Sequence, residues 1–235
     1  MNRLIVATIA IGLVVDRHGG AHGQLAVNIL AWAVFARLWL VSVPAQRPAL
    51  LACLVYATAG EVFLSLVWGL YDYRLGNIPL FVPPGHVLLF YLGTQLALRL
   101  QDGAEWWIAA LALPIVAGLA WAGRDTLGPL LYALFLACMA LSRSRRLYAT
   151  MLVLSLAMEL WGTWLGNWTW RHEVAWLGLV TANPPLAAGA FYAALDLLVV
   201  STVGGRRRQL PASPILTPST ASHQAATCSA RSSSR

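Results

Sequence analysis

Eight apolar segments divide most of this chain, and several of them approach the length of a membrane span. A helix needs roughly 17–25 apolar residues to cross a bilayer. Only 11% of the residues are charged, whereas a soluble domain carries about 25%. We therefore predict an all-α, polytopic integral membrane bundle with seven or eight transmembrane helices. The expected segments are about 4–15, 25–43, 50–70, 87–100, 106–121, 127–141, 147–165 and 186–203.

The placement of arginine predicts how the bundle is oriented. All 16 basic residues are Arg, and an orientation with both termini in the cytoplasm puts 12 of them in inner segments. Such an excess is typical of cytoplasmic loops. We therefore predict a multi-pass protein of the cell (inner) membrane, and the net charge of +7 does not indicate nucleic acid. Segment 4–15 is short, and either an uncleaved first helix or a signal sequence fits it.

Beyond the apolar segments, residues 204–235 are rich in Arg, Pro, Ser and Thr. Such a composition cannot bury enough apolar surface to fold. We predict a transmembrane bundle over residues 1–203 and a disordered, basic, cytoplasmic tail over residues 204–235.

One constellation of residues appears twice, about 97 residues apart. The first copy contains Glu61, Gly69-x-Tyr71-x-Tyr73-Arg74, Pro83-Pro84, Phe90-Tyr91 and Gln95. The second copy contains Glu159, Gly166-x-Trp168-x-Trp170-Arg171, Pro184-Pro185, Phe191-Tyr192 and Asp196. The distance between copies corresponds to four helices, and an even number leaves both copies in the same orientation. We predict two parallel repeats of four helices, over about residues 1–100 and 101–203.

Three acids lie within the apolar segments, namely Glu61, Glu159 and Asp196. An ionisable group at the bilayer centre costs roughly 2.5–3.5 kcal/mol on insertion scales, so it indicates a functional site. We predict that the three carboxyl groups point into one interior between the halves and are catalytic. The alternative is that each acid only forms a hydrogen bond between helices.

The aromatic residues of the repeat allow two interpretations. Tyr71, Tyr73, Trp168 and Trp170 fall at predicted helix ends, where Trp and Tyr often form an interfacial belt. They could instead line a cavity and offer ring faces to a cationic centre. The remaining candidate substrate-binding residues are His86, Tyr91 and Tyr192. His18 and His22 could supply two ligands, but a structural zinc site needs four. We expect neither a metal nor a cofactor.

Gly69-Leu-Tyr71-Asp-Tyr73, followed by the stretch from Gly76 to Pro83, resembles the carotenoid hydratases, a family of polytopic membrane proteins. Trp168-x-Trp170, followed by Leu177-Gly178 and Asn183-Pro184, is similar to a second block of that family. The resemblance implies addition of water to an isoprenoid double bond, or its proton-triggered rearrangement.

The function expected from the sequence is therefore that of a membrane enzyme, a hydratase or cyclase, acting on an isoprenoid or carotenoid-type lipid. Its expected partners are a lipophilic small molecule and membrane lipids. A carboxylic acid kept neutral by burial would protonate the double bond. Two alternatives stay open, a proton-coupled transporter and a non-enzymatic membrane assembly protein. The sequence does not indicate the oligomeric state.

Overall fold

The protein is helical in the computed structural model, which describes residues 1–209. Every apolar segment predicted from the sequence overlaps one α-helix. The eight α-helices of the described residues are α1 (Asn2–His18), α2 (Gly20–Val41), α3 (Arg47–Glu61), α4 (Val82–Ala97), α5 (Ala104–Trp121), α6 (Gly128–Leu141), α7 (Arg145–Leu165) and α8 (Gly189–Gln209).

The helix boundaries follow local sequence signals. Pro83 and Pro84 lie in the first turn of α4, where a missing backbone N–H costs nothing. Helix α4 therefore begins at Val82, before the predicted 87. Helix α3 passes directly into a π-helix, η1 (Val62–Val67), and together they cover the predicted segment 50–70 as far as Val67.

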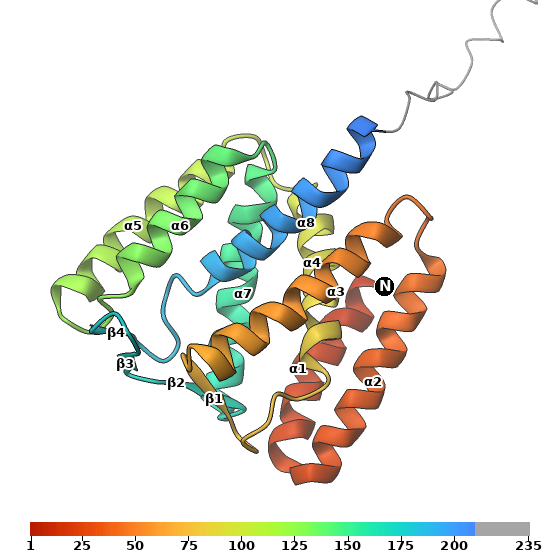
Figure 1. Cartoon of the computed structure of the whole chain (residues 1–235), viewed down its shortest axis with the longest axis horizontal. Coiled ribbons are helices and arrows are strands. Elements are labelled where there is room, and N and C mark those ends of the chain that lie inside the picture. The colour runs from red at the N-terminus through yellow and green to blue at the C-terminus, as the bar shows by residue number, and fades with distance from the viewer. Residues whose placement is uncertain (210–235) are drawn as a thin grey trace, which may run out of the picture. The chain divides into compact units, whose positions relative to one another are not determined.

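Successive helices of the bundle, residues 1–203, run in alternating directions. Figure 1 shows the α2–α3, α4–α5 and α6–α7 connections at one end of the bundle. The α1–α2 turn and the α5–α6 connection lie at the other end, together with the segments that follow η1 and α7. Both Pro-Pro segments, 83–84 and 184–185, belong to that second end. We call this second end the ribbon end, because two short strand pairs lie there.

Helices α4 and α7 form the centre of the bundle. Helix α4 packs against α1, α2, α3 and α7, and α7 also packs against α1, α5 and α6. Nine residues of α4 are buried, which is more than one side of a surface helix would bury. Helices α1 and α2 form an antiparallel pair on one side of this centre, and α5 and α6 form another pair.

The ribbon end contains two short strand pairs, which the all-α prediction did not include. Strand β1 (Tyr71–Tyr73) pairs antiparallel with β2 (Trp168–Trp170), and β3 (Glu173–Val174) pairs with β4 (Leu179–Val180). The β1–β2 ribbon joins two segments that are almost 100 residues apart. It therefore fixes the ends of α3–η1 and α7 relative to each other.

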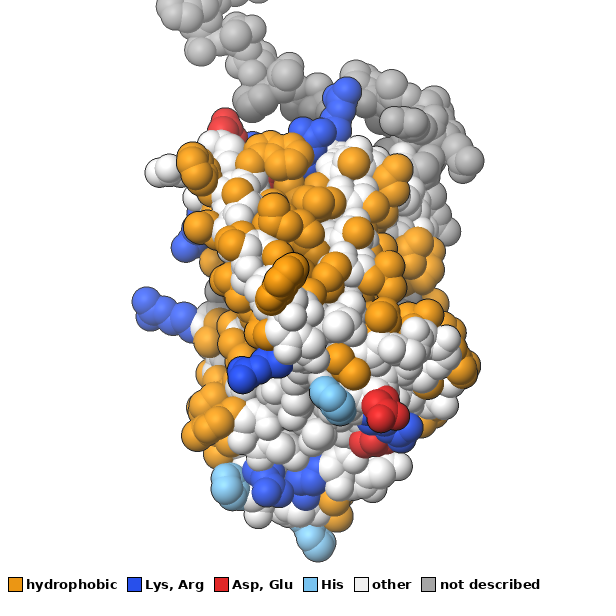
Figure 2. Space-filling model, turned by 90° about the vertical axis from the view of Figure 1, so that its left-hand side faces the viewer, with side chains coloured by type: hydrophobic (Ala, Val, Ile, Leu, Met, Phe, Trp, Pro, Cys, Tyr) orange, Lys and Arg blue, Asp and Glu red, His pale blue; other side chains and the backbone are white. Residues whose placement is uncertain are grey.

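The outer surface of the bundle is largely apolar. Within residues 1–209, three helices are long and apolar enough to cross a membrane, namely α2, the continuous helix Arg47–Val67 and α5. Trp107 and Leu111 of α5 are about 70% exposed. Figure 2 shows many hydrophobic side chains on the side of the molecule where α5 and α6 lie, with the His side chains and several Arg and acidic side chains toward its lower end. These features indicate association with a membrane.

Residues Met1–Val203 form one compact unit. Helix α8 ends at Gln209, the last described residue. The rest of the tail predicted to be disordered lies outside the described residues.

Candidate active site

Two similar units of the fold carry the acids Glu61 and Glu159. Glu61 is the last residue of α3, and the chain then runs through η1 to Gly69 and β1. Glu159 lies in α7, which ends at Gly166 and leads into β2. Both glycines have positive φ, 71° and 77°, a conformation that residues with a Cβ disfavour. Each helix therefore turns sharply into its strand at a glycine.

The π-helix explains why the spacing between the acid and the glycine differs between the two segments. Glu61 precedes its glycine by eight residues and Glu159 precedes its glycine by seven. A π-helix has more residues per turn than an α-helix and often appears as an insertion at functional sites. Because η1 accommodates the additional residue, both acids reach the same ribbon.

The ribbon directs four aromatic side chains into the bundle. Tyr71 pairs with Trp170 and Tyr73 with Trp168, and backbone bonds from the two arginines that follow the strands extend the pairing. Side chains of a strand alternate between its two faces. The rings of the four aromatic residues therefore share the inner face, and three of the four residues are buried. Their interpretation as an interfacial belt does not fit this position.

Glu61 accepts two hydrogen bonds from the first strand. The hydroxyl groups of Tyr71 and Tyr73 donate to its Oε2 over 2.9 and 2.7 Å. Its other oxygen, Oε1, lies 3.5 Å from Nε2 of His86 on α4. The Glu61 residue is 6% exposed. The carboxyl group is thus largely removed from water, with two hydrogen bonds to one oxygen and an ion-pair contact to the other.

Glu159 has a matching set of donors from the second strand. The indole N–H groups of Trp168 and Trp170 donate to its Oε2 over 2.8 and 3.0 Å. The hydroxyl of Tyr192 on α8 donates to Oε1 over 3.1 Å. Glu159 is 4% exposed, and three donors surround its carboxyl group.

A stacked pair of rings joins the two acids. The His86 imidazole lies on the Tyr192 ring, with 5.0 Å between centroids and 8° between planes. His86 contacts Glu61 and Tyr192 contacts Glu159, so the two carboxyl groups belong to one group of side chains. This carboxylate cluster consists of Glu61, Tyr71, Tyr73, His86, Glu159, Trp168, Trp170 and Tyr192.

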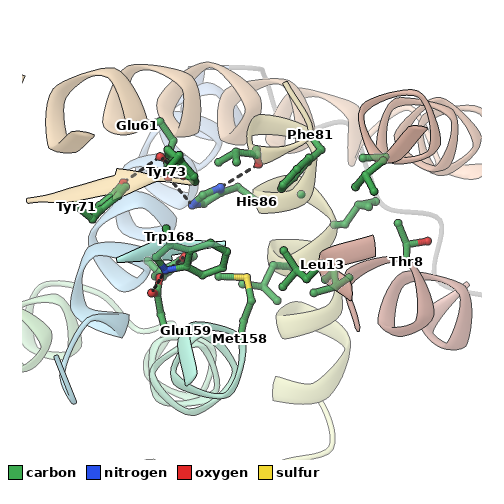
Figure 3. Close-up of a pocket in the computed structure, with 18 residues that line it drawn as sticks. Thr8, Leu13, Glu61, Tyr71, Tyr73, Phe81, His86, Met158, Glu159 and Trp168 are labelled. Carbon is green, nitrogen blue, oxygen red and sulfur yellow. Dashed lines mark hydrogen bonds and ion pairs between the residues drawn. The ribbon is translucent and has the colours of Figure 1, made fainter. Parts of the chain in front are cut away.

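The carboxylate cluster forms part of the wall of an otherwise apolar cavity. The cavity contains about 710 Å³ of space between atoms, part of which opens to the surface. Figure 3 shows Glu61 with Tyr73 and His86 at one side of it and Glu159 with Trp168 at another. The rest of the lining comes from α1, α2, α4 and α7 and is mostly apolar, namely Thr8, Ile9, Leu13, Val27, Ala31, Phe81, Val82, Gly85, Leu88, Leu89 and Met158.

A second cavity adjoins the same cluster. It contains about 850 Å³ of space and is lined mainly by α3, η1 and α8. Five cluster residues line both cavities: Glu61, Tyr71, His86, Glu159 and Tyr192. The cluster therefore stands between two apolar spaces.

Gly162 makes room for one of the cluster residues. It lies on α7 three residues after Glu159, and a Cβ at this position would overlap the six-membered ring of Trp168. The indole can reach the Glu159 carboxyl group because this residue has no side chain. Gly162 was not among the residues singled out from the sequence.

Two ion pairs at the ribbon end hold the segments around the cluster. Arg74 lies 3.5 Å from the buried Asp16 carboxylate at the end of α1, and Asn167 donates to the other oxygen of Asp16 over 2.6 Å. Arg171 donates two bonds of 2.7 Å to Asp72. The Arg171 guanidinium keeps the pKa of Asp72 below its usual value. These contacts fix α1 and both strands around the site.

Asp196 and Tyr91 occupy other positions. Neither residue lines either cavity. Asp196 is fully buried, and neither of its oxygens has a hydrogen-bond partner among the described residues. Its carboxyl group is close enough to Cys53, Cys138 and Tyr148 to interact with them electrostatically. The structure thus brings Glu61 and Glu159 together and leaves Asp196 out of the cavity lining.

Sequence reasoning missed the cavity walls supplied by α1 and α2. Thr8, Leu13, Val27 and Ala31 look like ordinary residues of apolar helices, and no pattern distinguished them. The stacking of His86 on Tyr192 also had no signal in the sequence. Among residues 1–209, no three His, Cys, Asp or Glu side chains come together as a possible metal site.

Comparison of the chain with models of known protein families, with curated proteins and with solved structures gave no match.

Proposed function

We propose that this protein is an integral membrane enzyme that protonates a carbon–carbon double bond of an isoprenoid or carotenoid-type lipid, as a hydratase or a cyclase. The observation that carries the proposal is the position of two buried carboxyl groups, Glu61 and Glu159, at one apolar cavity. The resemblance of the Gly69–Pro83 stretch to carotenoid hydratases supports the same chemistry.

The proposed fold in the membrane is a bundle of seven or eight spans made of two parallel four-helix repeats. The similar contacts of Glu61 with β1 and of Glu159 with β2 support it, as does the position of both strands at the ribbon end. Parallel repeats are related by an axis along the membrane normal, and binding sites commonly lie between them. In this proposal both termini are cytoplasmic and the ribbon end faces the opposite side of the membrane.

The proposed reaction uses each part of the cavity. An acid of the cluster transfers a proton to one carbon of the double bond, and the neighbouring carbon becomes a cation. Carboxylate oxygens and ring faces stabilise this cation, and cation–π contacts contribute up to about 2 kcal/mol each when water is excluded. In a hydratase, water then adds to the cation and returns a proton to the cluster. In a cyclase, a second double bond attacks and a neighbouring carbon loses the proton.

The apolar cavity suits a lipid substrate in two ways. Its walls bury hydrocarbon, and burial of apolar surface contributes roughly 25 cal/mol per Å². They also keep bulk water from the cation, which protects the reaction from unwanted trapping. The exposed apolar surfaces of α2, α3 and α5 support a location in the membrane, where such a substrate would dissolve.

The test is to replace Glu61 and Glu159 singly with glutamine in a host that accumulates linear isoprenoids. Acid–base groups typically contribute about 10²–10⁴-fold to a rate, so each variant is expected to lose the new product by at least 100-fold. Glu173→Gln is the matched control, because Glu173 is exposed on β3. Unchanged products in both variants, with normal protein accumulation, would exclude this function.

One observation favours a second candidate, the proton-coupled transporter. The carboxylate cluster separates two cavities, as a proton-binding site between two access routes would. Uptake of a solute into proteoliposomes driven by a proton gradient, and lost in Glu61→Gln and Glu159→Gln, would favour the transporter over the enzyme.

A further inference from the structure

We infer that Glu61 and His86 hold one proton between them, while Glu159 remains the fixed negative charge of the carboxylate cluster. The catalytic roles that follow rest on the proposed function. The inferred position of the proton rests on the hydrogen-bond and ion-pair contacts of these side chains and does not depend on the substrate.

The first step is the tautomer of His86. Its Nδ1 lies 3.0 Å from the backbone oxygen of Val82, one turn earlier in α4. A carbonyl oxygen only accepts hydrogen bonds, so Nδ1 must carry a hydrogen. If the imidazole is neutral, Nε2 therefore presents a lone pair.

The second step concerns the atom that Nε2 faces. Oε1 of Glu61 lies 3.5 Å away, and the two groups are 12% and 8% exposed. A bare lone pair opposite a bare carboxylate oxygen would be repulsive, and both side chains are largely removed from solvent. One hydrogen between the two atoms removes the conflict, either as an imidazolium that donates to Glu61 or as a carboxylic acid that donates to His86.

The third step is the different position of Glu159. Its Oε2 contacts two indole N–H groups, and an indole nitrogen is a donor that cannot accept. A hydrogen on Oε2 would point at other hydrogens. Its Oε1 already receives the hydroxyl of Tyr192, so all three contacts of the carboxyl group come from donors.

The difference between the two halves of the repeat supports this division. The strand beside Glu61 supplies two tyrosines, whose hydroxyl groups both donate and accept. They can turn and support Glu61 with or without its proton. The strand beside Glu159 supplies two tryptophans, which can donate to Glu159 but cannot accept a hydrogen from it. The titratable groups around the Glu61–His86 pair are Tyr71 and Tyr73 of β1, Glu159 of α7 and Tyr192 of α8.

Under the proposed function, the pair is the proton donor and Glu159 is the counter-ion of the substrate cation. Donation forms one C–H bond and leaves the pair without its proton. In a hydratase, water forms the C–O bond, and the proton released from its oxygen returns to the pair. Water is thus the one co-reactant, and no net proton is consumed.

Two spectroscopic measurements on the full chain in lipid membranes test the location of the proton. NMR of protein labelled with ¹⁵N-histidine, with His86→Gln as the difference reference, identifies the protonated nitrogens of His86. Infrared difference spectra of Glu61→Gln and Glu159→Gln identify any carboxylic acid band. Glu173→Gln is again the matched control, and circular dichroism verifies that each variant is folded.

The inference predicts that Nδ1 of His86 is protonated at neutral pH. It also predicts one of two combinations: a protonated Nε2 with no acid band, or an acid band that disappears in Glu61→Gln. A neutral His86 protonated on Nε2 alone, or an acid band that disappears in Glu159→Gln, would overturn it. If the proton is found as predicted but both Gln variants keep the product, the proposed function fails and the proton assignment stands.

Discussion

The bond between Trp168 and Glu159 gives the sharpest stability prediction. Trp168→Phe keeps an aromatic ring but removes the N–H that donates to Oε2 over 2.8 Å. A hydrogen bond to a charged group contributes about 1.5–3 kcal/mol. In a chain of this size 1 kcal/mol shifts the unfolding midpoint by about 2–4 °C. The expected loss is therefore about 3–12 °C.

The assay uses two buried thiols as reporters of unfolding. Cys53 and Cys138 are 0% and 1% exposed, so a thiol-reactive dye reaches them when the bundle opens. Cys228 lies outside the described residues, and Cys228→Ser removes its contribution to the signal. The matched control is Trp164→Phe on α7, the helix that carries Glu159, because Trp164 is 74% exposed.

A double-mutant cycle separates the hydrogen bond from the change in ring size. In a Glu159→Gln background, Trp168→Phe no longer removes a bond to a charge, so most of its effect on the midpoint should disappear. The reasoning is refuted if Trp168→Phe and Trp164→Phe shift the midpoint equally, or if the effect of Trp168→Phe persists in the Gln background.

Three further predictions follow from the same contacts. Gly162→Ala should lower both the unfolding midpoint and product formation, because its Cβ would displace the Trp168 indole. Gly118→Ala on α5, where a Cβ meets no atom within 4 Å, should change neither; equal effects would contradict the account. Asp72→Asn should cost about 0.2–1 kcal/mol at pH 7. Because the pKa of Asp72 is lowered by Arg171, this cost should vanish as pH falls from 3.8 through the lowered pKa; a cost independent of pH in titrated unfolding curves would contradict it. Asp196→Asn should keep or raise the midpoint, because the carboxyl group has no partner to lose, and a clear loss would show an unrecognised contact.

Much of the helical architecture could be predicted from the sequence. Apolar segments identified every helix because burial in lipid or core demands long runs such as 147–165. The boundaries were less certain, and α4 began earlier than expected because Pro83 and Pro84 fit inside its first turn. The strands were missed because three residues are too few to show a period of two. The β1–β2 pairing also brings together Tyr71 and Trp170, which are almost 100 residues apart in the sequence.

The repeated residues indicated more about the site than the apolar segments around them did. The extra residue between Glu61 and Gly69, relative to Glu159 and Gly166, was visible in the sequence and corresponds to the π-helix. The aromatic donors could be listed from the sequence, but their partners could not, because an N–H or O–H can also face the membrane interface.

The side of the helix from which each acidic side chain projects could not be predicted from the sequence. Asp196 was grouped with Glu61 and Glu159 because it lies at a similar depth in an apolar segment. Depth does not determine which neighbour a side chain meets, and the packing of α8 leaves Asp196 near Cys53 and Cys138 instead of the cavity. Consecutive residues of an α-helix project about 100° apart around its axis, so a shift of one position changes which neighbour a side chain meets.

The measurement that tests the central claim most directly is deuterium incorporation. Membranes containing the protein are incubated with linear isoprenoids in D₂O, and the products are returned to H₂O and analysed by mass spectrometry. Protonation of a double bond by the Glu61 side of the cluster predicts one deuterium held on carbon in the wild-type product and no such product from Glu61→Gln. A product without deuterium on carbon, or equal incorporation by Glu61→Gln, would contradict the account.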